Sequence, residues 1–113
     1  MRKDTILIVG ANGQLGTVLT NRLRELLGQN QVIASDIRLP KSINEPFEQL
    51  NILDSDRLVE IVKKYNVSQI YHLAAILSAK GEINPMKTWE INMNGLFNVL
   101  EVAKEHNIDK VFF

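Results

Sequence analysis

Short apolar runs alternate along the chain with longer stretches in which apolar residues recur every three or four positions. Residues 5–9 form an unbroken β-branched and leucine run, which is typical of a strand covered on both faces of a sheet. Apolar residues then recur at helical spacing, as one stripe, between residues 15 and 27, and Gly28 is suited to end that helix. The stripe consists of Leu15, Val18, Leu19, Leu23, Leu26 and Leu27.

The remaining sequence continues the alternation of strands and helices. Acidic and capping residues at 54–56 precede a second helical pattern, and Asn84-Pro85 is typical of the start of a third helix. Strands alternating with helices predict βαβ units and an α/β fold with a mostly parallel sheet. The expected strands after the first are 31–35 (ending at Asp36), 47–50, 69–75 and 110–113, and a polar loop with two prolines covers 38–46.

Three glycines lie between the first predicted strand and the first predicted helix, at Gly10, Gly13 and Gly16. In a strand-to-helix turn, the first permits a tight turn, the second lets a pyrophosphate approach the backbone, and the third lets the helix lie close to the sheet. Asp36 follows Gly16 by 20 residues, at the end of the second predicted strand. This combination predicts a dinucleotide site in which Asp36 accepts hydrogen bonds from the adenosine ribose and repels a 2′-phosphate, which favours NAD over NADP. The alternative is that the glycines only shape a loop. It does not explain why a strand precedes them, a helix follows them and an acidic residue lies at the expected spacing.

Composition narrows the possible chemistry. The 113 residues fit one domain, and the formal net charge of zero without a basic tract argues against nucleic acid and anionic lipid as partners. The absence of cysteine excludes disulfides, thiolate zinc sites and thiol nucleophiles, and the two histidines are too far apart to suggest a metal site. No apolar run is long enough to cross a membrane, and the N-terminus is unlike a signal peptide. We therefore expect a cytoplasmic protein without a metal.

Four segments together resemble the extended short-chain dehydrogenase/reductase superfamily, of the NAD-dependent epimerase/dehydratase type. They are GANGQLG at 10–16, SDIR at 35–38, HLAA at 72–75 and NMNGLFNVLEVA at 92–103. In detail the chain is most similar to the L-threonine 3-dehydrogenase branch, through ILIVGANGQLGTVLT, VIASDIR, AAILSA and the stretch from 84 to 100. Nucleotide-sugar epimerases and dehydratases share the same skeleton and remain an alternative. The resemblance implies a Rossmann-like NAD-binding domain that covers residues 1–113.

The resemblance also implies roles for individual residues. At Asn51 the family often has an acid beside the adenine, and the asparagine oxygen can still accept from the adenine amino group. Ser78 matches a position that contacts substrate. His72 alternates with apolar neighbours, so we expect a packed, hydrogen-bonded histidine rather than a general base, and Asn94 and Asn98 are expected to face solvent. The implied cofactor-binding residues are Gly10, Asn12, Gly13, Gln14, Leu15, Gly16, Asp36, Ile37, Asn51, Ile52, Leu73, Ala74, Ala75 and Asn92.

The catalytic residues of the superfamily have no counterpart in this sequence. They are a Tyr-x-x-x-Lys pair with a serine or threonine, but Tyr65 and Tyr71 are followed four residues later by Gln69 and Ala75. We assign no catalytic residue and expect the N-terminal, cofactor-facing part of an enzyme that oxidises L-threonine, with the sheet truncated in the fifth strand. The alternatives are an epimerase or dehydratase, or a non-catalytic dinucleotide-binding module. The spacing of the apolar residues between 86 and 100 predicts that they are buried in the core or in a contact between subunits. A homodimer is expected for the full-length parent.

Overall fold

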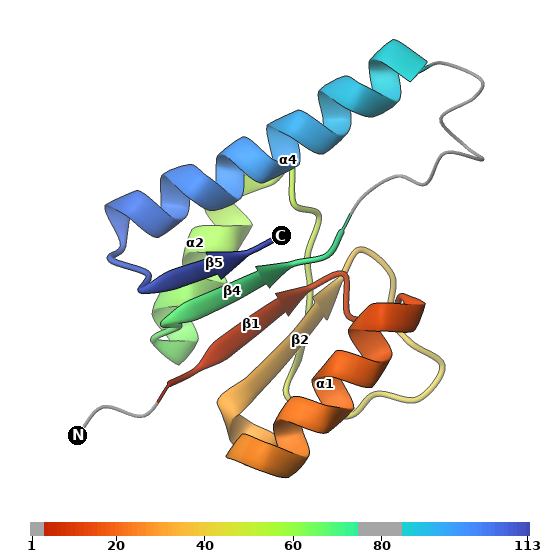
Figure 1. Cartoon of the computed structure of the whole chain (residues 1–113), viewed down its shortest axis with the longest axis vertical. Helices are drawn as coiled ribbons and strands as arrows, with labels where there is room; N and C mark the ends of the chain where they lie inside the picture. Colours follow the sequence, from red (N-terminus) through yellow and green to blue (C-terminus); the bar gives the residue numbers. More distant parts are fainter. Residues whose placement is uncertain (1–3, 75–84) are drawn as a thin grey trace.

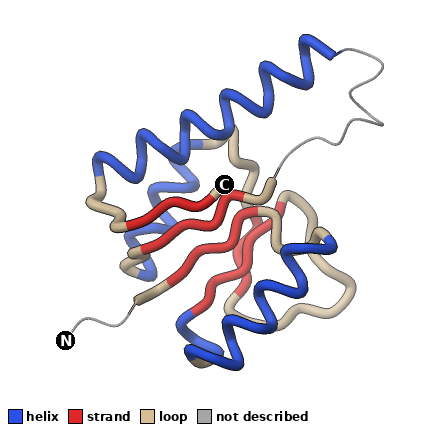
Figure 2. Tube along the Cα trace, in the orientation of Figure 1, coloured by secondary structure: helices blue, strands red, loops and turns tan. Residues whose placement is uncertain are grey.

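The computed structural model describes residues 4–74 and 85–113, and these form a parallel sheet with helices on both faces (Figure 1; Figure 2). Every predicted strand and helix is present, so the predicted α/β class is confirmed. The strand expected over 69–75 ends earlier, at His72. In chain order the elements are β1 (Ile6–Val9), α1 (Gln14–Leu27), the short 3-10 helix η1 (Gln29–Gln31), β2 (Val32–Asp36), β3 (Phe47–Gln49), α2 (Ser55–Tyr65), β4 (Gln69–His72), α4 (Pro85–Glu105) and β5 (Lys110–Phe112).

The five strands lie in the order β3-β2-β1-β4-β5, and every neighbouring pair is parallel. The chain first winds from β1 to β2 and β3, and then returns to place β4 and β5 on the other side of β1. The direction of winding therefore reverses between β1 and β4. In sheets of this kind, ligands bind in the crevice at the carboxyl ends of the strands, at the point of reversal.

Two apolar clusters cover the two faces of the sheet. Figure 1 shows α2 and α4 on one face and α1 on the other. On one face, α2 and α4 pack against alternate strand residues that include Leu7, Val9, Ile33 and Ile70. On the other face, α1 packs against Ile6, Ile8 and other strand residues. Because β1 is buried on both faces, its continuous apolar run agrees with the strand predicted there.

The apolar stripe predicted for α1 does not face the sheet as a whole. Leu19 and Leu23 pack against the sheet, but Leu15, Val18 and Leu26 are at least 64% exposed, and Leu27 is also exposed. The face of the helix that lies closest to the sheet instead carries Gly16, Thr20 and Arg24, which are buried. Short side chains at the start of this face let the helix approach the strands, and this rotates the larger leucines toward solvent.

A similar outcome applies to the apolar residues early in α4. Met86, Trp89, Phe97 and Leu100 are exposed, so they are not core residues of the described chain. The buried residues of α4 are Gly95, Val99, Val102 and Ala103. The predicted start of this helix at Pro85 is confirmed.

A charged cluster joins β3 to α2 immediately before the turn that carries several pocket residues. The carboxylate of Glu48 accepts hydrogen bonds from Arg57 at 2.8 Å, from Lys64 at 3.0 Å and from the hydroxyl of Tyr65. Burial by itself raises the pKa of Glu48, but the hydrogen bonds from Tyr65, Lys64 and Arg57 outweigh it and lower the pKa to about 2. Arg57 also donates to the main-chain oxygen of Gln49 at 3.1 Å, so the cluster fixes the end of β3 against α2.

Candidate functional site

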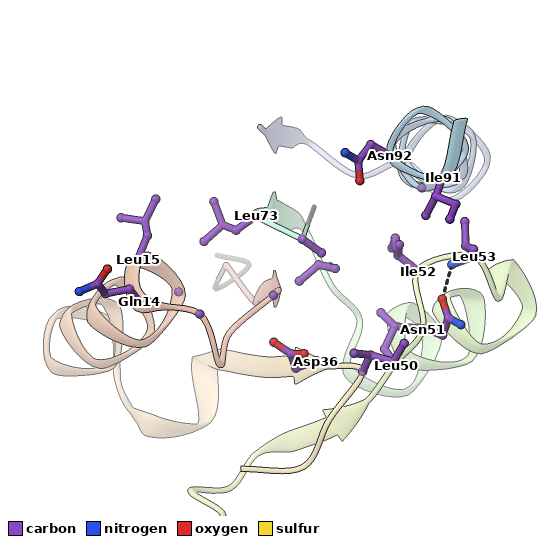
Figure 3. A pocket seen from close by; sticks show the side chains of 17 residues that line it. Gln14, Leu15, Asp36, Leu50, Asn51, Ile52, Leu53, Leu73, Ile91 and Asn92 are labelled. Atoms are coloured by element: carbon purple, nitrogen blue, oxygen red, sulfur yellow. Dashed lines mark hydrogen bonds between the residues drawn. The ribbon is translucent and has the colours of Figure 1, made fainter. Parts of the chain in front are cut away.

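A pocket of about 750 Å³ opens where the winding of the sheet reverses, at the carboxyl ends of β1, β2 and β4. Its volume lies within the usual range for small-molecule and cofactor sites. Figure 3 shows Gln14 and Leu15 on one side of the pocket and Ile52, Ile91 and Asn92 on the opposite side. The lining residues are Val9, Gly10, Gly13, Gln14, Leu15, Gly16, Asp36, Ile37, Leu50, Asn51, Ile52, Leu53, Leu73, Ala74, Ile91, Asn92 and Gly95.

The glycine loop holds β1, β4 and α1 closer together than side chains would allow. Gly10 has φ +94°, and a Cβ there would lie 2.8 Å from the main-chain nitrogen of Ala74. A Cβ at Gly16 would lie 2.2 Å from the main-chain oxygen of Gly10. Both contacts are with backbone, which cannot move aside as a flexible side chain could. The predicted roles of Gly10 in the tight turn and of Gly16 in close helix packing therefore agree with the observed geometry.

The N-terminus of α1 presents unpaired donors to this pocket. The main-chain N–H groups of Gln14, Leu15 and Gly16 have no acceptor among the described residues, and no side chain caps the helix. The first turn also lacks an acidic residue. Such an end carries partial positive charge as well as free N–H groups, and it suits an anionic diphosphate. These residues fit the pyrophosphate of a dinucleotide.

Asp36 lies at the end of β2, beside the glycine loop. Its Oδ2 accepts from the main-chain N–H of Asn12 at 3.0 Å, and its Oδ1 accepts from that of Arg38 at 3.4 Å. The side-chain amide of Asn12 donates to the main-chain oxygen of Arg38 at 2.6 Å, which ties the loop to the end of β2. Since a carboxylate has about four acceptor positions, Asp36 keeps lone pairs for two ribose hydroxyls.

The other end of the pocket is apolar and is closed by the turn between β3 and α2. Ile37, Leu50 and Ile52 line it, and the side-chain amide of Asn98 on α4 donates to the main-chain oxygen of Ile52 at 3.0 Å. A Cβ at Gly95 would lie 2.8 Å from Cγ2 of Ile52, so the glycine lets α4 approach this turn. A flat base fits between such apolar walls.

The prediction that His72 is packed agrees with the structure, but the prediction that it is hydrogen-bonded is wrong for the described residues. Its Nδ1 is buried and has no hydrogen-bond partner among them. Burial lowers the pKa of His72, because the charged imidazolium loses its solvation. The ring is therefore neutral at physiological pH, and it lies beside Gly95 of α4.

Most of the predicted site residues line the pocket, but several residues make contacts other than those expected. Asn12 does not line the pocket, because its side chain is bonded to Arg38. Asn98 was expected to face solvent, yet it holds the turn at Ile52, while Asn94 is exposed as predicted. Ala75 and Ser78 lie outside the described residues. The lining residues that sequence reasoning missed are Val9, Leu50, Leu53, Ile91 and Gly95.

Two further findings bear on the chemistry of the described residues. No group of histidine, cysteine, aspartate or glutamate within 4–74 and 85–113 is placed to hold a metal ion. No helix in those same ranges has the length and apolar character needed to span a membrane.

Comparison with known proteins agrees with this geometry. Residues 6–113 match the sequence model of the NAD dependent epimerase/dehydratase family. An uncharacterized epimerase/dehydratase of Staphylococcus aureus (strain USA300) is 44% identical over 107 residues, which are 91% of this chain. The solved L-threonine dehydrogenase from Clostridium difficile is 44% identical over 97% of the chain with a TM-score of 0.88. The GalE-like L-threonine dehydrogenase from Cupriavidus necator, in its holo form, is 42% identical over 96% with a TM-score of 0.90.

The chain spans only about a third of the length of these relatives. It covers 33% of the Staphylococcus aureus protein and 36% of each of the two solved dehydrogenases. The match to the family model nevertheless runs through almost all of the chain, from the first strand to the last residue. The chain therefore belongs to the NAD dependent epimerase/dehydratase family, within the short-chain dehydrogenase/reductase superfamily, and NAD is the cofactor of that family.

Proposed function

We propose that residues 1–113 form the NAD-binding part of an oxidoreductase that acts on L-threonine. The observation that supports this most is the pocket at the reversal of the sheet. It brings together N–H groups of α1 that no described residue accepts from and the carboxylate of Asp36 at the end of β2. The N–H groups of Gln14, Leu15 and Gly16 bind the pyrophosphate, and Asp36 accepts from the adenosine ribose. The apolar end at Leu50 and Ile52 takes the base.

Before any reaction, the residues around the pocket must orient the cofactor. Leu73 and Ala74 follow β4 and line the pocket between its two ends, where a small side chain at 74 leaves room for the middle of the cofactor. When bound, NAD accepts a hydride from the carbon that carries the substrate hydroxyl. Asn92 lines the same pocket from α4 and stabilises the inner part of the site.

The proposed reaction converts L-threonine and NAD to 2-amino-3-oxobutanoate, NADH and a proton. The support is the similarity to two solved L-threonine dehydrogenases at 42% and 44% identity. Because the chain spans only about a third of the length of these relatives, we propose that it is part of a longer, cytoplasmic protein whose other residues supply the acid/base chemistry. A nucleotide-sugar epimerase or dehydratase is the second candidate, favoured by the family that matches the chain and by the relative in Staphylococcus aureus.

Two experiments separate cofactor binding from substrate choice. Isothermal titration of the 113-residue chain with NAD should give saturable binding that Asp36→Ala weakens at least tenfold, whereas Asp109→Ala should leave it unchanged. Asp109 is an exposed carboxylate just before β5, at the amino ends of the strands and away from the pocket. Its replacement therefore controls for the loss of one negative charge. For the longer protein, NADH formation measured at 340 nm with L-threonine supports the dehydrogenase. Turnover of a nucleotide-sugar without reaction of threonine would replace it with the second candidate.

We also propose that α4 forms a contact between two copies of the longer protein. Met86, Trp89, Phe97 and Leu100 place large apolar side chains in solvent along this helix, and such surfaces are typical of protein interfaces. Sedimentation should show a dimer, and Trp89→Glu together with Phe97→Glu should shift it toward monomer. A monomeric wild-type protein at micromolar concentration would refute this contact.

A further inference from the structure

The side chain of Asn12 joins the glycine loop to the segment that follows β2. Its Nδ2 group donates to the main-chain oxygen of Arg38 at 2.6 Å. The carboxylate of Asp36 spans the same gap, because its Oδ2 accepts from the main-chain N–H of Asn12 at 3.0 Å and its Oδ1 from that of Arg38 at 3.4 Å. The three hydrogen bonds form a closed ring that includes a carboxylate lining the pocket.

The two sides of this ring are not equally fixed. The glycine loop is held by its own main chain, since the N–H of Gly10 donates to the main-chain oxygen of Ser35 at 2.9 Å. The main-chain atoms of Arg38 make no hydrogen bonds to the described residues other than those to Asp36 and Asn12. The contact to Asp36, at 3.4 Å, is long for a hydrogen bond. The amide of Asn12 is therefore the main anchor of Arg38.

The segment that Asn12 anchors belongs to the pocket wall. Asp36 and Ile37 line the pocket immediately before Arg38. On the side of β3, the main-chain oxygen of Ile37 accepts from Nε2 of Gln49 at 3.0 Å. Because β2 lies between β1 and β3, the side chains of Asn12 and Gln49 hold this segment from opposite sides. Loss of the Asn12 amide would leave it attached to β3 but free to move away from the glycine loop.

The position of the Asp36 carboxylate has opposite effects on two cofactors, and this step rests on the proposed binding of NAD. A carboxylate fixed beside the adenosine ribose accepts from the 2′-hydroxyl of NAD and repels the 2′-phosphate of NADP. When the carboxylate can swing away, NAD loses a preorganised acceptor and NADP loses a fixed repulsive charge. The guanidinium of Arg38 forms no ion pair with the described residues, so the freed segment also carries a cation that can pair with a phosphate.

We propose that Asn12 is a positioning residue for cofactor specificity. Through Arg38 it holds Asp36 at the ribose, and it thereby sets the preference for NAD over NADP. The side chain of Asn12 does not line the pocket, so it acts without touching the cofactor. Removal of the amide weakens the binding of NAD and strengthens that of NADP, whereas a general loss of loop structure would weaken both.

Titration of the 113-residue chain with NAD and with NADP tests the proposal in wild type, Asn12→Leu, Asn12→Ala and the control Asn30→Ala. Leucine keeps the approximate size of asparagine but cannot donate, and Asn30 is an exposed asparagine of η1, just before β2. We expect both Asn12 variants to bind NAD about threefold more weakly and NADP about threefold more tightly, because one exposed hydrogen bond changes an equilibrium by a factor of several. The ratio of the two affinities should be unchanged in Asn30→Ala.

The outcomes distinguish this inference from the proposed function. Asn12 variants that keep the wild-type ratio of affinities overturn the inference alone, and so does an equal loss of affinity for both cofactors. Wild type that binds NAD and NADP equally also overturns it. Because Asn12 is exposed, circular dichroism should show both variants folded, and unfolding of both would mean that Asn12 stabilises the fold instead. Failure of wild type to bind either cofactor overturns the proposed function, and the inference with it.

Discussion

Replacement of Gly13 and of Gly16 by alanine should separate cofactor binding from stability, although the two glycines lie in one loop. A Cβ at Gly13 would meet only the main-chain oxygen of Gly10, at an ordinary 3.5 Å, and the backbone there has φ −68°, which alanine adopts freely. A Cβ at Gly16 would lie 2.2 Å from that same oxygen and 2.9 Å from Cα of Ala11. Gly13→Ala therefore adds a methyl group to the pocket wall, whereas Gly16→Ala forces main-chain atoms apart.

The expected magnitudes follow from these contacts. At Gly13, reduced freedom of the unfolded chain stabilises alanine by about 0.4–1 kcal/mol, and the weaker capping by alanine offsets it, so stability should change by less than about 0.5 kcal/mol. The added methyl group occupies space that the pyrophosphate needs, so affinity for NAD should fall at least tenfold, or about 1.4 kcal/mol. At Gly16, higher helix propensity gives about 1 kcal/mol, but overpacking against rigid backbone costs about 3 kcal/mol or more, so we expect a net loss of about 2 kcal/mol.

Urea denaturation followed by circular dichroism measures stability, and titration with NAD measures affinity. The account expects Gly13→Ala to unfold like wild type while binding NAD poorly, and Gly16→Ala to unfold at clearly lower urea. The reasoning is refuted if Gly16→Ala is as stable as wild type, because the close approach would then be unimportant. It is equally refuted if Gly13→Ala binds NAD as tightly as wild type, since the pyrophosphate could not lie where the loop places it.

Three further predictions concern charged residues. Replacement of Asp36 by alanine should reduce the ratio of the affinity for NAD to that for NADP at least tenfold in competition titrations, because no carboxylate then repels the 2′-phosphate. The folded-state pKa of Glu48 is about 2, below its ordinary value of 4.5. The stabilisation by its carboxylate should therefore be fully present above pH 4.5 and be lost as the pH falls toward 2. Glu48→Gln should flatten this part of the curve of unfolding free energy against pH. Arg24 donates to the main-chain oxygens of Val32 and Pro46, so Arg24→Met should destabilise the chain by about 2 kcal/mol or more in urea, and Arg24→Lys should lose less.

The strands and their parallel pairing could be predicted because their signals are local. The unbroken apolar run before Gly10 and the acid at Asp36 each mark a strand end that the structure confirms. The glycine spacing then placed the pocket, since main-chain geometry at Gly10 and Gly16 leaves few alternatives. Such features depend on neighbours along the chain and therefore appear in a single sequence.

The orientation of α1 could not be predicted from its pattern, because the leucines have the right period for burial on either side. Which side faces the sheet depends on the contact between Gly16 and Gly10, a distance between segments that periodicity does not contain. The buried guanidinium of Arg24 is a related case. It is buried because carbonyls of β2 and of the loop before β3, 8 and 22 residues further along the chain, converge on it.

The role of Asn98 was missed for the same reason. Asparagine on a helix is usually solvated, and only the approach of α4 to the turn at Ile52, which Gly95 permits, brings the amide to a main-chain oxygen. Likewise, the hydrogen bond from the main-chain N–H of Leu53 to Oδ1 of Asn51 follows from the conformation of the turn and not from the identity of the residue. Sequence reasoning thus predicted most of the residues that line the pocket, but it could not assign the hydrogen bonds around it.

The measurement that tests the central claim most directly is the change in backbone amide chemical shifts when NAD is added to the ¹⁵N-labelled chain. The account predicts that the largest changes occur at Gly13, Gln14, Leu15 and Asp36, where donors and the carboxylate meet the pyrophosphate and ribose. The shifts of residues 66–68 and 107–109, at the amino ends of β4 and β5 and opposite the pocket, should stay unchanged. Shifts confined to that opposite edge, or no shifts at millimolar NAD, would contradict the account.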